Sequence, residues 1–187
     1  MTTVYVTHDQ VEASIERDNG RFAVQLGEHA LSLGEETLAA RPALEGYVGR
    51  KIVVGVRPEN LEDAALETDT PEDQRMRGVV VLREPLGSEI VAHFTVAAPP
   101  ALTEDVRELA RDVGQESAVQ AAAAEGSNET VMIGRFGPRS RVKNGDVVDV
   151  AVEMGSLHFF DLETGLGIYS GQTKLDTQSN NGEGAQG

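Results

Sequence analysis

Cysteine and tryptophan are both absent from this 187-residue sequence. Without cysteine the chain can form no disulfide, thiol nucleophile, zinc–thiolate site or iron–sulfur cluster. Aromatic residues make up only 4% of the sequence, so aromatic platforms for nucleic-acid bases are not expected. No apolar run approaches the roughly 18 residues of a membrane-spanning helix, and the first residues lack the pattern of a signal peptide. The composition favours a soluble, cytoplasmic protein.

Positive charge is also scarce. Lys and Arg total 16 against 31 Asp and Glu, which gives a formal net charge of −15. Such a chain lacks the basic surface of a nucleic-acid-binding protein and is repelled by anionic lipid. Hydrophobic residues make up 40% of the chain, which is enough for a packed core. We therefore expect a folded acidic protein that binds no nucleic acid and does not insert into a membrane.

The motifs of nucleotide hydrolysis are missing as well. The sequence contains neither a glycine-rich loop ending in Gly-Lys-Ser/Thr nor a Gly-x-Ser-x-Gly elbow. Without the loop, nothing cradles the β- and γ-phosphates of ATP, so a self-sufficient hydrolase of that class is excluded. An enzyme fragment whose partner supplies the missing loops stays an alternative, and an ATPase assay on the isolated chain separates the two.

What the sequence does contain is a series of short alternating segments separated by turn residues. Asn19-Gly20 and Asn144-Gly145 favour the positive φ angles of tight turns, and Pro85-Leu86-Gly87 and Thr164-Gly165 mark two further turns. Strands and helices do not alternate. The pattern therefore predicts an all-β fold made of OB-like small β-barrels, either two packed closely or one extended barrel.

Four stretches depart from this pattern. Leu102, Val106 and Leu109 recur at helical spacing, so we expect a helical insertion at about 97–130, with helix over 102–124. We interpret residues 35–46 as a polar connector and the acidic residues 61–75 as a solvated loop. The last residues, 171–187, are rich in Gly, Asn, Gln and Ser and predict a disordered tail.

Histidines and carboxylates offer few candidate sites. His8 either positions a phosphate or a water, or lies on an exposed N-terminus. His8 and Glu12 have the spacing of helical metal ligands, but no third ligand accompanies them, so we expect no metal site. His158, Asp161 and Glu163 form a second group, which we interpret as a turn beside the barrel core.

One loop concentrates positive charge within this acidic chain. It carries Arg135, Arg139, Arg141 and Lys143. The loop either binds an oxyanion or an acidic partner, or is simply a solvated hairpin loop.

Several segments resemble the ATP-binding subunits of carbohydrate-type ABC importers, related to the maltose and glycerol-3-phosphate importers. Thr2 to Ala13, TTVYVTHDQVEA, resembles their switch-histidine segment. Val54 to Leu61, VGVRPENL, resembles the Gly-x-Arg-Pro-Glu-His-Leu stretch of their regulatory domain, with Asn60 at the usual histidine position. Gly78–Val96 resembles that domain's Leu-Gly hairpin, and 142–146 and 158–165 resemble its closing strands. The resemblance covers about 1–13, 47–96 and 131–169.

The resemblance implies a transport-associated OB-type (TOBE) region, which lies behind the nucleotide-binding domain and helps two ATPase subunits dimerise. Its motif residues here are Gly55, Arg57, Pro58 and Glu59. In the family the histidine matching His8 contacts the γ-phosphate, and the full-length subunit binds ATP and Mg. Because the Walker A, signature and Walker B motifs are absent from this chain, we expect no catalytic residue, no enzyme activity and no cofactor in it.

The resemblance also predicts the organisation of the chain. Residues 1–13 would be a remnant of the nucleotide-binding domain, spliced at Val11-Glu12-Ala13 to an OB-type regulatory domain over 14–170. The full-length ATPase would meet ABC permease subunits at the inner face of the cell membrane. An alternative is a small oxyanion-binding barrel of the molybdate type, with the Arg135–Lys143 loop as its site, although the net charge opposes anion binding.

We also expect a weak homodimer. Lys51–Val56 and Gly78–Leu82 are the most apolar strand segments, and an exposed edge strand of that kind is a template for pairing. Two chains of charge −15 repel each other, so the dimer should tighten as salt screens the charge.

Overall fold

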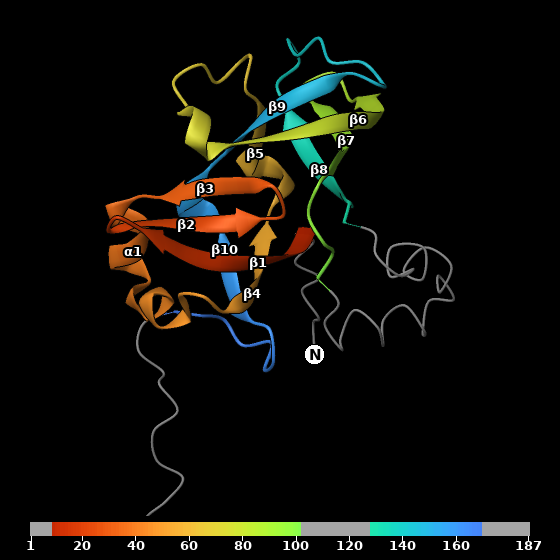
Figure 1. Ribbon diagram of the computed structural model, residues 1–187. Coiled ribbons are helices and arrows are strands. Elements are labelled where there is room, and N and C mark those ends of the chain that lie inside the picture. Colours follow the sequence, from red (N-terminus) through yellow and green to blue (C-terminus); the bar gives the residue numbers. More distant parts are fainter. Residues whose placement is uncertain (1–8, 102–127, 170–187) are drawn as a thin grey trace, which may run out of the picture.

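The computed structural model describes residues 9–101 and 128–169, which form two antiparallel sheets of five strands each (Figure 1). Sheet A has the order β10-β4-β1-β2-β3, with strands β1 (Asp9–Asp18), β2 (Arg21–Leu26), β3 (His29–Leu33), β4 (Lys51–Val56) and β10 (His158–Asp161). Sheet B has the order β5-β9-β6-β7-β8, with strands β5 (Leu61–Asp63), β6 (Arg75–Pro85), β7 (Ile90–Val96), β8 (Thr130–Phe136) and β9 (Val147–Val152). The all-β, OB-like prediction is confirmed.

The described helices are all short and lie between strands. They are α1 (Glu35–Ala40), η1 (Pro42–Tyr47), η2 (Pro58–Asn60), η3 (Glu72–Gln74) and η4 (Met154–Ser156). None of these described helices is long and apolar enough to cross a membrane. The expected polar connector, residues 35–46, is thus partly helical. Thr37 and Leu44 are buried and attach it to the rest of the protein.

The acidic segment 61–75 is only in part the solvated loop that the sequence predicts: most of residues 65–73 are exposed, but its start is buried. It begins with β5, where Leu61 is fully buried and pairs with Val152 of β9. Ala64 is buried as well, at 5% exposure. The prediction was wrong for these first residues, because two apolar side chains among many carboxylates are enough to bury them in the core.

The predicted turns are present, but they do not all join neighbouring strands. Asn19 and Gly20 have φ angles of 50° and 83° and connect β1 to β2, as the Asn-Gly signal predicts. Asn144-Gly145 precedes β9, which pairs with β5 and β6 rather than with the preceding strand β8. The hairpin predicted around Thr164-Gly165 is not a two-stranded ladder. A single β-bridge, between Phe160 and Gly167, joins its two sides.

One hydrophobic core lies between the two sheets. Sheet A contributes Ile15, Val24 and Ile52 among others, and sheet B contributes Phe94 and Phe136, whose ring centroids lie 6.2 Å apart. The alternating burial of β2 and β7 places every second side chain in this core. The two sheets therefore stabilise each other, since each covers the apolar face of the other.

The two most apolar strands are not edges. β4 lies between β1 and β10, and β6 lies between β7 and β9. Neither Lys51–Val56 nor Gly78–Leu82 can therefore serve as the exposed edge considered for the expected homodimer, because both strands have partners on each side. The edge strands are β3 and β10 in sheet A, and β5 and β8 in sheet B.

Strand β1 runs without interruption through position 13, where the sequence analysis placed a domain boundary. It pairs with β4 from Asp9 to Ser14 and with β2 from Ser14 to Asp18. The origin of residues 1–13 stays a prediction. His8, the predicted helix over 102–124 and the tail 171–187 lie outside the described residues.

The described ends of the expected insertion are not helical. The Glu12 backbone N–H donates to the Pro99 carbonyl at 3.0 Å, and the Glu28 N–H donates to the Ala97 carbonyl at 3.2 Å. Residues 97–101 therefore run along β1 and the β2–β3 turn, and on the other side β8 begins at Thr130.

Candidate functional site: the junction between the two sheets

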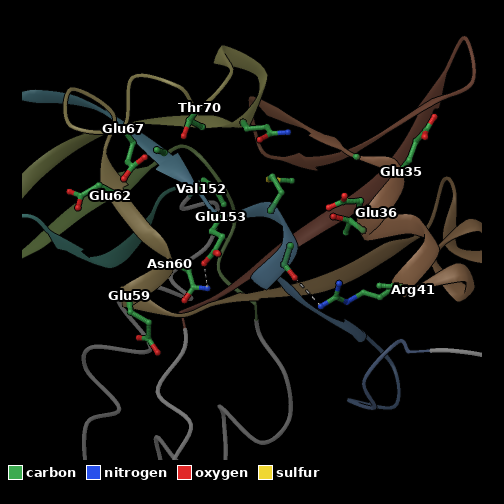
Figure 2. A pocket seen from close by; sticks show the side chains of 17 residues that line it. Glu35, Glu36, Arg41, Glu59, Asn60, Glu62, Glu67, Thr70, Val152 and Glu153 are labelled. Carbon is green, nitrogen blue, oxygen red and sulfur yellow. Dashed lines mark hydrogen bonds between the residues drawn. The ribbon is translucent and has the colours of Figure 1, made fainter.

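The chain passes between the sheets twice, and the two passages lie side by side. The first passage leads from β4 in sheet A through η2 to β5 in sheet B. The second leads from β9 in sheet B through η4 to β10 in sheet A. β5 and β9 are paired, with Leu61 opposite Val152, so the two passages meet where this ladder ends. Figure 2 shows the junction from close by.

Asn60 and Glu153 tie the two passages together. The Asn60 side-chain amide donates to the Glu153 carboxylate at 2.9 Å. The Glu153 backbone N–H donates to the Asn60 carbonyl at 3.0 Å. Because one bond runs in each direction, the end of η2 and the start of η4 are held together.

The family-like motif residues build the first passage. Gly55 is buried in β4, between Gln10 of β1 and His158 of β10. Pro58 begins η2, where its ring suits a first helical position, and the Arg57 carbonyl accepts the Asn60 N–H at 2.9 Å. Glu59 is exposed beside it. The motif therefore shapes the turn between the sheets.

A groove of about 880 Å³ opens beside this junction (Figure 2). Its walls come from α1, from both passages and from the loop before β6. Among the described residues that line it, Arg41 is the one arginine. Its guanidinium donates to the Gly155 carbonyl at 3.4 Å and lies 5.5 Å from the centre of the Phe159 ring. The lining holds six glutamates: Glu35, Glu36, Glu59, Glu62, Glu67 and Glu153. The groove is thus strongly acidic and repels anions.

Two of these glutamates have structural partners. Both Glu62 oxygens accept the Gly137 backbone N–H, at 2.8 and 3.0 Å, and Glu153 accepts the Asn60 amide. The side chains of the other four have no hydrogen bond or ion pair with any residue that the structure describes. Within the same described ranges, no group of three or more His, Asp or Glu side chains has the arrangement of a metal site.

The basic loop predicted from the sequence is divided by the fold. Arg135 lies on β8 and forms an ion pair with Glu89 at 3.6 Å. Arg139 and Arg141 line a second hollow, of about 550 Å³, together with Arg75. The Lys143 backbone N–H donates to the Asp146 carboxylate at 2.9 Å. Three aspartates also line the hollow: Asp63, Asp146 and Asp149.

Arg75 in that hollow is already engaged by the backbone. Its guanidinium donates to the Thr70 carbonyl, with the Nε bond at 2.9 Å, and to the Thr68 carbonyl at 3.3 Å. Arg139 and Arg141 are exposed, and neither forms a hydrogen bond or ion pair through its guanidinium with a described residue. Of the four predicted basic residues, the fold therefore brings these two into one hollow, whereas Arg135 lies on β8 beside Glu89.

A buried polar pair beside the second hollow was missed by the sequence analysis. Asp63 and Ser140 are 5% and 4% exposed, and the Ser140 hydroxyl donates to the Asp63 carboxylate at 2.6 Å. The Ala65 backbone N–H donates to the same carboxylate at 3.0 Å. These bonds fasten the loop after β8 to the end of β5. No local signal marks the pair, because its members are 77 positions apart.

Asp9, also missed, fastens sheet A to the edge of sheet B. Its carboxylate accepts the Ile133 backbone N–H of edge strand β8 at 2.6 Å. Burial raises the pKa of Asp9 to about 6, although the Ile133 hydrogen bond and the nearby His93 act in the opposite direction. The group therefore titrates close to neutral pH.

Of the group His158, Asp161 and Glu163, the last two form a turn, as expected, whereas His158 begins strand β10 and pairs with Gly55. The Asp161 carboxylate accepts the backbone N–H groups of Thr164 and Glu163 at 2.8 and 3.0 Å, and the Tyr47 hydroxyl at 2.9 Å. Burial by itself raises the pKa of Asp161, but these hydrogen bonds outweigh it and leave that pKa below its ordinary value.

Comparison with known families places the junction at a boundary between two domain types. The family model of the MalK OB fold domain matches residues 10–61, and the model of the TOBE domain matches residues 54–127. The two matches overlap over 54–61, which is the passage from β4 to β5. The chain contains a MalK OB-fold domain and a TOBE domain. The predicted family is thereby confirmed.

Curated relatives extend the similarity over most of the chain. The trehalose/maltose import ATP-binding protein MalK of Thermococcus litoralis is 27% identical over 90% of this chain and 49% of its own length. The trehalose import ATP-binding protein SugC of Mycobacterium tuberculosis is 29% identical, with 89% and 51% covered. The sn-glycerol-3-phosphate import ATP-binding protein UgpC of Rhizobium meliloti is 28% identical, with 86% and 45% covered. The chain thus spans about half the length of these relatives, to which it is distantly homologous.

One solved structure is similar at a lower level. The cytoplasmic molybdate-binding protein ModG shares 11% identity with this chain, at a TM-score of 0.40, over 85% of this chain and 98% of that one. A similarity of this size supports no statement about a ligand.

Proposed function

We propose that this chain is the regulatory part of an ATP-binding subunit of a carbohydrate ABC importer, and that it carries no ATPase core of its own. The observation that carries the proposal is the succession of a MalK OB-fold match and a TOBE match, which meet at the passage between the sheets. The relatives named for trehalose, maltose and glycerol-3-phosphate import support the same class of transporter.

In this proposal the chain contributes binding surfaces to the transporter and no catalytic residues. The complete subunit meets the permease subunits at the cytoplasmic face of the membrane, and two copies associate through their regulatory parts. ATP and Mg belong to the nucleotide-binding half, because no Gly-Lys-Ser/Thr phosphate loop occurs in this sequence. The acidic groove beside the junction also offers no cradle for a triphosphate, since it repels anions.

A chimera tests the proposal. Residues 9–169, which keep strand β1 whole, replace the corresponding half of the trehalose import ATP-binding protein SugC, in cells that lack that protein. We expect restored trehalose uptake, whereas the nucleotide-binding half alone should restore little. A chimera that is produced in full and hydrolyses ATP, but supports no uptake, would count against a regulatory role in this class of importer.

The isolated chain tests the absence of an ATPase core. We expect no ATP hydrolysis, no change in melting temperature with Mg-ATP, and no effect of His8→Ala on either measurement. A ligand that binds only the folded state raises the melting temperature, so a shift with Mg-ATP would reveal a site. Turnover that disappears in His8→Ala would contradict the proposal.

A second candidate function is an oxyanion-binding barrel. Arg139 and Arg141 favour it, because both line the 550 Å³ hollow without a described ion-pair partner. The three aspartates of the same hollow oppose it. Molybdate, tungstate and sulfate are titrated while the melting temperature is followed, with Arg139→Gln/Arg141→Gln as the control. A shift that this double variant removes would support the second candidate over the first.

A further inference from the structure

Asparagine is followed directly by glycine at three places in the sequence, and two of them lie within the described residues. Asn19-Gly20 forms the turn between β1 and β2, and Asn144-Gly145 lies in the loop before β9. All four residues are exposed. The third pair, Asn181-Gly182, lies outside the described ranges. An exposed Asn-Gly pair can react without any enzyme, so the structure around each pair determines how fast it does so.

The reaction is an attack of the main chain on the asparagine side chain. The glycine backbone nitrogen gives up its proton to a base and bonds to the side-chain carbonyl carbon, and the amide nitrogen leaves as ammonia. The resulting succinimide ring then takes up one water molecule. Opening at one carbonyl gives aspartate, and opening at the other gives isoaspartate, in which the main chain runs through the former side chain. Glycine favours the attack because it has no Cβ to hinder it.

At Asn19-Gly20 the attacking nitrogen is free. The two residues have φ angles of 50° and 83° and form a two-residue turn, which the pairing of Asp18 with Arg21 closes. Within the described ranges, no group accepts the Gly20 N–H and none binds the Asn19 amide. A Cβ built on Gly20 would meet nothing within 4 Å, so a base from solvent can reach this nitrogen.

At Asn144-Gly145 the corresponding nitrogen is engaged. The Gly145 N–H donates to the Val80 carbonyl at 2.6 Å. The neighbouring residues are fastened as well, because the Lys143 N–H donates to the Asp146 carboxylate at 2.9 Å, and the Val80 N–H donates to the Asp146 carbonyl at 2.9 Å. The nitrogen must therefore lose a hydrogen bond before it attacks, and the loop resists the rotation that would bring it to the Asn144 side chain.

We propose that Asn19 is a self-modification site, which deamidates through a succinimide with Gly20, whereas the fold protects Asn144. The inference does not depend on the proposed function, because the reaction needs only the chain and water. From the usual strength of a hydrogen bond, the contact with Val80 slows the attack at Asn144 by roughly two- to tenfold. The restrained loop adds to this protection.

The modification acts on the hairpin of β1 and β2. Isoaspartate lengthens the main chain by one methylene group in a turn that has room for two residues, so the pairing of Asp18 with Arg21 is lost. Aspartate leaves the main chain intact but adds a negative charge beside Asp18. Because β1 is the central strand of sheet A, loosening this hairpin lowers the stability of the whole sheet.

Peptide mapping of the aged full chain tests the site. The protein is incubated at mildly alkaline pH, with and without urea, and mass spectrometry follows each asparagine separately. The rate in urea depends on the local sequence alone, so the ratio of the folded to the unfolded rate isolates the effect of structure. We expect this ratio to be at least about fivefold higher at Asn19 than at Asn144. Equal ratios, or a higher ratio at Asn144, would overturn the proposal.

Matched variants provide a second measurement. Asn19→Gly removes the reacting side chain, and Gly-Gly suits the same turn, so the fold should persist. Asn144→Gly is its control, and all proteins also carry Asn181→Gln, which removes the third pair. A methyltransferase specific for isoaspartate should label the aged parent chain and Asn144→Gly alike, and Asn19→Gly at least about fivefold less. Equal labelling of the two variants would overturn Asn19 as the site.

The melting temperature of the same samples tests the effect on the hairpin. Ageing should lower it in the parent chain and in Asn144→Gly, and leave it unchanged in Asn19→Gly. A parent chain that mapping shows to be modified at Asn19, but that melts as before, would overturn the loosening of the hairpin and leave the site itself in place.

Discussion

The Asn60 side chain donates a hydrogen bond to the Glu153 carboxylate at 2.9 Å, and the Glu153 backbone N–H donates one to the Asn60 carbonyl at 3.0 Å. The two residues are 93 positions apart, one on each passage between the sheets. Glu153 is exposed and Asn60 half-buried, so the side-chain bond contributes about 0.5–1.5 kcal/mol.

Asn60→Asp should destabilise the protein more than Asn60→Ala does. The aspartate removes the donor and places a second carboxylate beside Glu153, so we expect a loss of about 1–2 kcal/mol at pH 7. Glu153→Gln should restore most of the loss, because its amide can donate to the new carboxylate. Urea unfolding of the two single variants and the double variant measures the coupling. Losses that simply add would show that the two side chains do not interact.

Asp9→Asn should stabilise the protein at pH 8. The raised pKa of about 6, against 3.8 in the unfolded chain, means that the folded state binds the proton more tightly. Its contribution to stability is therefore full below pH 4 and is lost as the pH rises through 6, at a cost of roughly 1–3 kcal/mol. Asparagine removes the buried charge and still accepts the Ile133 N–H. Urea unfolding at pH 4 and pH 8 should show the variant gaining only at the higher pH.

Asp161→Asn should act with the opposite pH dependence. The pKa of Asp161 lies below 3.8, so the ionised form stabilises the fold above that value, and this contribution is lost as the pH falls through the folded-state pKa. We expect the variant to lose about 1 kcal/mol at pH 7 and less at pH 3. Tyr47→Phe, which removes one of the donors, should show a smaller loss of the same kind. An equal loss at both pH values would contradict the role of charge.

Gly134→Ala should destabilise sheet B. A Cβ at this position would lie 2.7 Å from the Phe136 ring and 3.3 Å from the Phe94 ring, both in the core. Overpacking of this kind costs about 1–3 kcal/mol. Gly46→Ala serves as the control, because a Cβ there meets nothing within 4 Å. Thermal unfolding should show a lower melting temperature for Gly134→Ala only, and unchanged values for both would mean that the rings move aside.

The features that local chemistry determines could be predicted from the sequence. Asn19-Gly20 specifies the turn between β1 and β2 because both residues take a positive φ. The motif around Arg57 and Pro58 indicated the family. The sequence did not predict that this motif lies between the two sheets. Sheet order could not be predicted, because the pairing of β10 with β4 joins Phe159 to Val54 from opposite ends of the chain.

The site residues that were missed depend on partners far away in the sequence. In the sequence Asp63 is one of many acidic residues and predicts an exposed carboxylate. In the structure it is buried, and Ser140 donates a hydrogen bond to it. Arg135 and Arg139 are close neighbours in sequence, but Arg135 points to Glu89 on the outer side of sheet B whereas Arg139 lines the second hollow. Basic residues that are close in the sequence therefore did not form one basic surface in the fold.

The central position of β1 has a mechanical consequence. The strand is hydrogen bonded to β4 along its first half and to β2 along its second, and all of these pairings are antiparallel. A force applied at Asp9 along the strand axis therefore loads both ladders in shear, so many hydrogen bonds resist together instead of opening one at a time. Because the Asp9 carboxylate also binds Ile133 of β8, the same force reaches sheet B. A displacement of the start of β1 would therefore move the two sheets together as one rigid unit.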